Sequence, residues 1–213
     1  MTIGFALGVV LTVSAKAGPA EPTLAITLRV YNYAQVPEEI LSEAEKEVTE
    51  IFRKIGVETS WLHVPQSSGG NQLEFDYPRS KALDLRISLA SRLMTKPMEK
   101  HLGPQDDVLG WSTPTGDKSG HLAYVFYHRV EDFVQARNLH EHKARILGLA
   151  IAHEMGHLLL PVHTHSSRGV MRANWDRQDF RLATRGNLGF TSKQAELIRS
   201  EVLRRSRLDL EVP

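Results

Sequence analysis

The chain of 213 residues contains no cysteine. This absence excludes disulfide bonds, thiolate metal ligands and thiol nucleophiles at once. A domain of this size must then be stabilised by its hydrophobic core, and 41% of the residues are hydrophobic.

An excess of charge of either sign is also missing. The sequence has 26 Lys and Arg against 25 Asp and Glu, which gives a formal net charge of +1. Such a balance gives no general attraction to nucleic acid or to an anionic membrane, so we expect no nucleic-acid partner. Four arginines near the C-terminus, Arg199, Arg204, Arg205 and Arg207, are interpreted as the solvated face of a helix.

The apolar run near the N-terminus, residues 3–13, is too short to cross a bilayer, which requires about 20 apolar residues. It is followed by Ala15-Lys16-Ala17, a pattern of small residues that signal peptidases accept. The sequence therefore predicts a signal peptide over residues 1–17. We expect an exported protein, extracellular, periplasmic or in the cell envelope, without a stable membrane anchor.

The most informative segment is HEMGHLLLPVH, residues 153–163, which lies in an apolar stretch typical of a helix. On a helix His153 and His157 are one turn apart on the same face, so both can bind one metal ion. Glu154 lies roughly 100° further round the helix and can reach the open metal position through a water molecule. The spacing indicates a catalytic zinc site with Glu154 as general base.

A third ligand is expected where the chain turns back after this helix. Pro161 should end the helix near Leu159, because proline lacks an N–H and disfavours helical backbone before it. His163 then follows His157 by six residues. His165, two residues further on, could replace or supplement it, although the motif spacing favours His163.

This segment resembles the metzincin zinc metallopeptidases, whose pattern is H-E-x-x-H-x-x-G-x-x-H followed by a turn that contains methionine. His153, Glu154, His157 and His163 match that pattern by position, and residues 167–171 resemble the turn. The strong part of the resemblance covers residues 144–175.

The resemblance implies that Met171 forms an apolar floor beneath the three imidazoles. One position departs from the pattern, because Leu160 stands where the family usually has glycine. A leucine is strained in the left-handed conformation that glycine adopts cheaply. We therefore expect Leu160 and Pro161 to make the turn with extended backbone.

Periodicity gives the order of elements along the chain. Strands are predicted at 23–33, 57–64, 83–87, 108–115 and 121–128, and helices at 38–55, from 139–144 to 159, and from 192 to about 205. The last helix opens with a capping box formed by Thr191 and Gln194. The order resembles a metzincin-like α+β fold with a twisted, mixed five-stranded sheet and helices above a cleft. Residues 18–213 would form one catalytic domain, with an upper subdomain to about 160 and a small, mostly irregular lower one over 161–213.

The resemblance also implies the chemistry. A monomer holding Zn²⁺ would hydrolyse peptide bonds of a polypeptide or peptide substrate through a zinc-bound water, with Glu154 as base. The strand around residues 109–112 would lie at the sheet edge and pair with the extended substrate. Ala173, Asn174 and Trp175 would line a selectivity pocket beside the zinc.

Two alternatives stay open. In a gluzincin-type peptidase the third ligand is a glutamate on a later helix, where Glu196 and Glu201 are available. A metzincin-like domain can also keep its metal and act as a catalytically inactive interaction module. The presence of Glu154 argues against that module, because a non-catalytic site has no evident use for a base.

Overall fold

The computed structural model describes residues 23–65, 81–96, 108–112, 121–161 and 165–211. The predicted signal peptide lies outside these ranges. Among the helices that the ranges contain, none combines the length and the apolar character that crossing a membrane requires.

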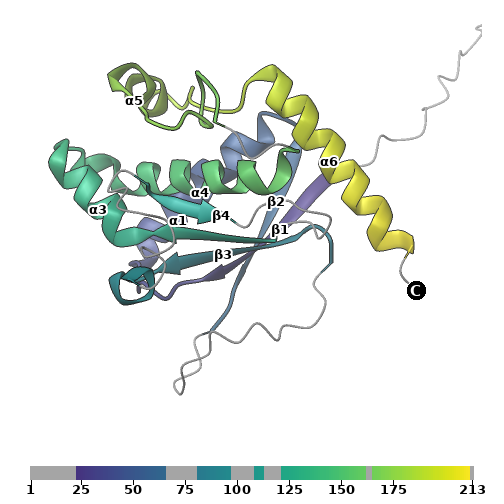
Figure 1. Cartoon of the computed structure of the whole chain (residues 1–213), viewed down its shortest axis with the longest axis horizontal. Helices are drawn as coiled ribbons and strands as arrows, with labels where there is room; N and C mark the ends of the chain where they lie inside the picture. Colours follow the sequence, from purple (N-terminus) through teal and green to yellow (C-terminus); the bar gives the residue numbers. More distant parts are fainter. Residues whose placement is uncertain (1–22, 66–80, 97–107, 113–120, 162–164, 212–213) are drawn as a thin grey trace, which may run out of the picture.

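A five-stranded mixed sheet forms the centre of the fold, as predicted. Its strands are β1 (Leu24–Tyr31), β2 (Val57–His63), β3 (Asp84–Ala90), β4 (Gly110–Ser112) and β5 (Leu122–Phe126). They lie in the order β2-β1-β3-β5-β4, and every neighbouring pair is parallel except the last. The short β4 is therefore an antiparallel edge strand, paired only with β5 within the described sheet (Figure 1).

The helices are α1 (Glu38–Arg53), α3 (Tyr127–Ala136), a 3₁₀ turn η1 (His140–His142), α4 (Lys143–Leu159), α5 (Arg177–Thr184) and α6 (Ser192–Glu211). The predicted helices correspond to α1, α4 and α6. One predicted boundary was wrong, because the fifth strand ends at Phe126 and Tyr127 already begins α3. The region expected to be mostly irregular after the metal motif includes one short helix, α5.

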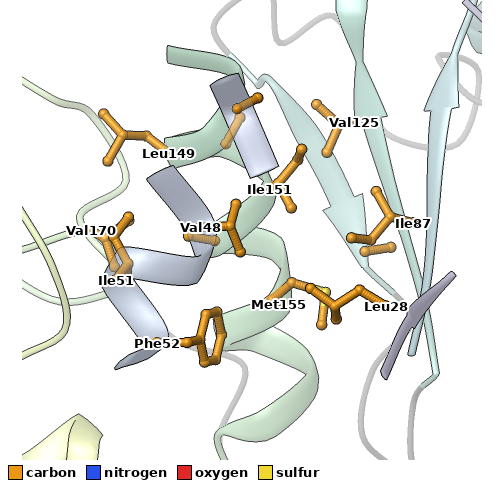
Figure 2. Close-up of a cluster of buried hydrophobic side chains, with 14 of the residues drawn as sticks. Leu28, Val48, Ile51, Phe52, Ile87, Val125, Leu149, Ile151, Met155 and Val170 are labelled. Carbon is orange, nitrogen blue, oxygen red and sulfur yellow. The ribbon is translucent and has the colours of Figure 1, made fainter. Parts of the chain in front are cut away.

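Alternation of apolar residues places β1 in the core, because Ile26, Leu28 and Val30 are buried on one side of the strand. Helix α1 turns its apolar stripe toward the sheet and ends before Gly56, which adopts a φ of +74° that favours glycine. Figure 2 shows side chains of β1, β3 and β5 meeting those of α1 and α4 in one buried cluster.

Helix α4 is the central helix of the domain. Every residue from Ile146 to Leu159 is buried, so this helix has no solvated face over its last four turns. It crosses α1 closely at Gly148, where a Cβ would lie 2.7 Å from the carbonyl oxygen of Ala44. The helix ends at Leu159, and Leu160 has extended backbone with φ −90° and ψ 142°. The expectation of extended backbone is therefore confirmed at Leu160.

The C-terminal part contains α5, which Figure 1 shows on the side of α4 away from the sheet, and α6, which passes the C-terminal end of α4 and also contacts β1. The predicted capping box opens α6, because the Thr191 N–H donates to Gln194 Oε1 at 2.9 Å and the Gln194 N–H reaches Thr191 Oγ1 at 3.4 Å. The interpretation of the late arginines as a solvated face was wrong for Arg205, whose side chain is fully buried.

Candidate metal centre

Three histidines meet at the end of α4. The ligand nitrogens of His153, His157 and His165 all lie within 4.8 Å of one another. Their ring centroids are separated by 4.8 Å, 5.0 Å and 5.2 Å. The two helical histidines are buried, whereas His165 is exposed, so the cluster lies at the protein surface with one side toward solvent.

The spacing of these nitrogens suits a small dication. In a tetrahedral site with Zn–N bonds of 2.0–2.1 Å, two ligand nitrogens are about 3.3 Å apart. The Nε2 atoms of His153 and His157 face each other at 3.1 Å, close to that separation. Imidazole is also a ligand that zinc prefers. The donor set therefore fits a metal ion held by three imidazoles.

The orientation of His153 is fixed by the backbone beyond the helix. Its Nδ1 lies 2.8 Å from the carbonyl oxygen of Val170, which can only accept a hydrogen bond, so Nδ1 carries the proton. The Nε2 atom is then left with a lone pair for a metal. The indole of Trp175 donates to the same oxygen at 3.2 Å and packs edge-on against the His153 ring at 6.1 Å.

His165 is held beside the helix by a closed loop. The N–H of Ser166, the next residue, donates to the carbonyl oxygen of Met171 at 2.8 Å, and Arg172 donates its N–H to Gly169 at 3.1 Å. Gly169 has a φ of +78°, so the tight turn favours glycine there. This loop, residues 166–172, contains the segment 167–171 that was predicted to resemble the methionine turn.

Met171 is fully buried and packs against α4. A Cβ added to Gly156 would overlap the Met171 sulfur and lie 2.9 Å from the Phe190 ring. Gly156 lies between the two helical histidines in the sequence, so the thioether packs directly on the helix segment that carries them. The structure thus places the thioether against α4, and its role as an apolar floor beneath the imidazoles stays a prediction.

The carboxyl group of Glu154 is buried beside the edge strand. Its side chain packs on Gly110, where a Cβ would lie 2.6 Å from Glu154 Cγ and 2.7 Å from Oε1. Burial raises the pKa of this carboxyl to about 8, and the hydrogen bond from the Ser112 hydroxyl acts in the opposite direction. A cation held by the adjacent imidazoles would further favour the charged carboxylate.

The structure brings together some of the predicted residues and not others. His153, Glu154, His157 and Met171 lie at one site. The preferred third ligand, His163, lies outside the described residues, and the alternative His165 completes the described cluster.

Of the three residues expected beside the zinc, Trp175 contacts His153, while Ala173 and Asn174 are exposed. Sequence reasoning missed two residues that touch Glu154, namely Gly110 and the buried Ser112. Both belonged to a predicted strand, but only its pairing at the edge, beside α4, shows what they contact.

Comparison with known proteins adds no assignment. No family model matches the chain, and no curated protein matches it. The mixed α+β fold and the histidine cluster are therefore the basis on which a class of protein can be argued.

Proposed function

We propose that the protein is a zinc-dependent metallopeptidase of the metzincin type, with His153, His157 and His165 as metal ligands. The observation that carries the proposal is the convergence of three imidazoles from two separate segments of chain, with a buried glutamate adjacent to one of them in sequence. The methionine beneath the helix and the antiparallel edge strand beside the glutamate support the same class.

Zinc is the metal that this donor set favours. Three neutral nitrogen ligands leave a tetrahedral ion with one open position, which is the arrangement of catalytic rather than structural zinc. A zinc ion bound there supplies a Lewis acid and a water molecule acidified to a pKa of about 7.

The protein's own residues supply the proton transfers. Glu154 accepts the proton of the attacking water and then delivers it to the amine that leaves when the peptide bond breaks. Burial of the carboxyl beside the imidazoles favours such a role, because a group of raised pKa both accepts and returns a proton near neutral pH. The outer edge of strand β4 can pair with an extended peptide through backbone hydrogen bonds, and this supports a polypeptide as the substrate.

A glutamate as third ligand is less well supported. Glu201 accepts hydrogen bonds from Arg204 and Arg205 at 2.7 Å, and both arginines lower its pKa against the effect of burial. Glu196 is exposed on α6. Neither lies in the described group of metal-binding side chains, whereas His165 does.

We also propose that the protein is exported, and the N-terminal sequence is the support for this part of the proposal. A fusion of residues 1–30 to a reporter enzyme that is active only outside the cytoplasm tests it. Activity that depends on the apolar run 3–13 supports an extracellular, periplasmic or cell-envelope location, and an inactive reporter contradicts it.

The experiment for the activity compares the unaltered protein with Glu154→Gln, which keeps the shape of the side chain and removes its basicity. Zinc content and cleavage of a peptide library are measured for both. We expect one zinc per chain in each protein and cleavage by the unaltered one alone. Zinc in both with cleavage in neither would show a non-catalytic binding module, and no zinc in either would contradict the metal centre.

A further inference from the structure

Two residues of the edge strand β4 contact Glu154, the proposed general base. Gly110 and Ser112 are alternate residues, so they project from the same face of the strand. Both are buried, and both contact Glu154. Trp111, between them, packs on Tyr124 at 5.9 Å.

The two residues act on Glu154 in different ways. Gly110 has no side chain, and this lets the glutamate lie against the strand, because a Cβ would approach Glu154 Oε1 to 2.7 Å. Ser112 supplies a hydroxyl that donates a hydrogen bond to the carboxylate. The residues of α4 around Glu154 are buried. The Ser112 hydroxyl therefore gives the carboxylate a hydrogen bond of defined direction from a strand outside the helix.

The place of the strand is itself well fixed. Ser112 pairs with Ala123 and Gly110 with Val125 of β5. Before the strand, the Leu109 carbonyl accepts from Phe126 N–H at 2.8 Å, and the Val108 carbonyl accepts from the buried Arg129 at 3.0 Å. The hydroxyl of Ser112 is therefore presented from a rigid support, as a positioning contact requires.

We propose that Ser112 is a positioning residue that orients the Glu154 carboxylate. Strand β4, which is expected to bind the substrate, would then also hold the general base in the orientation that proton transfer requires. The inference rests on the proposed function. A misdirected carboxylate still permits zinc and substrate binding but slows proton transfer, because that step depends on hydrogen-bond geometry. Ser112 does not itself touch the reacting atoms.

The kinetic test compares Ser112→Ala, Ser112→Thr and the matched control Ser88→Ala. Ser88 is another buried serine, on β3, which β5 separates from β4. We expect Ser112→Ala to lower kcat by about 10–100-fold, the range typical of groups that orient an active-site residue. KM and zinc content should stay unchanged, Ser112→Thr should recover most of kcat, and Ser88→Ala should match the unaltered protein.

Two kinetic outcomes would overturn the proposal. One is a kcat of Ser112→Ala no lower than that of Ser88→Ala. The other is a loss of zinc in Ser112→Ala that parallels the loss of kcat, because the serine would then act on the fold or the metal rather than on the base.

A spectroscopic arm separates this inference from the proposed function. The infrared difference spectrum between zinc-loaded Ser112→Ala and the unaltered protein should show a shifted carboxylate stretch. The shift should vanish when both proteins also carry Glu154→Gln. A silent spectrum refutes the contact even if peptides are cleaved, whereas a shift in a protein that cleaves nothing upholds the contact and contradicts only the peptidase.

Discussion

The guanidinium of Arg205 donates a hydrogen bond to the carbonyl oxygen of Leu158 at 2.5 Å, which joins α6 to the last turn of α4, the helix that carries His153 and His157. The carbonyl belongs to the group at a helix C-terminus that has no partner within the helix. The arginine also pairs with Glu201 at 2.7 Å and is fully buried. The end of α4, from which the chain departs toward His165, is thus held by a charge from a distant segment.

Replacement of Arg205 by methionine should therefore destabilise the domain. Methionine retains the apolar stem but leaves the Leu158 carbonyl buried without its charged donor, which costs about 2–3 kcal/mol of unfolding free energy. Urea denaturation measures the loss. Arg204→Met is the matched control, because Arg204 pairs with the same Glu201 from an exposed position and should change stability by less than about 1 kcal/mol. Equal losses in the two variants would contradict the role of the buried contact.

Gly156→Ala tests the packing of the methionine loop on the metal helix. The new Cβ would overlap the Met171 sulfur, so we expect a loss of about 1–3 kcal/mol from overpacking. This loss should appear although alanine is the better helix former by about 1 kcal/mol. The midpoint temperature of thermal unfolding and the affinity for zinc should both be lower than in the unaltered protein. Gly189→Ala is the control, since nothing lies within 4 Å of its Cβ, and an equal effect there would refute the interpretation.

The fold could be predicted largely from local patterns. Alternating apolar residues in β1 and the helical spacing of apolar residues in α1 predict which side of each element faces the core. Pro161 predicts the end of α4. Helix α3 was missed because the strand pattern of β5 runs into it at Tyr127 without a break. A stronger signal existed for α5, where Asp176 and Asp179 form a reciprocal capping box.

The site was less accessible from sequence. The helical pair and the base follow from spacing within one helix, but the third ligand depends on how a loop closes. His163 was preferred by analogy with a motif, whereas His165 is placed by the hydrogen bond between Ser166 and Met171, a contact that spacing does not encode. The burial of Arg205 could not be predicted either, because its partner carbonyl lies 47 residues away.

The fluorescence of Trp175 should report metal binding. Its indole packs on His153 and shares the Val170 carbonyl with it, so a dication bound to that imidazole changes the electric field at the indole. In a Trp61→Phe, Trp111→Phe background, titration with zinc should alter the emission and saturate at one equivalent. Trp175→Phe in the otherwise unaltered protein should abolish most of the response. A response that persists there would place the metal elsewhere.

The choice between His165 and His163 as third ligand can be decided by zinc affinity. We expect His165→Ala to weaken zinc binding by more than about 100-fold, since groups that only orient a ligand already contribute 10–100-fold. His163→Ala should have a smaller effect, because the described cluster closes without it. Competition with a chelating dye gives both affinities, and His142→Ala, outside the cluster, corrects for the loss of a histidine in general. A larger loss in His163→Ala would instead identify His163 as the third ligand, at the metzincin spacing of six residues after His157. The loop that follows Pro161 would then close in a different way.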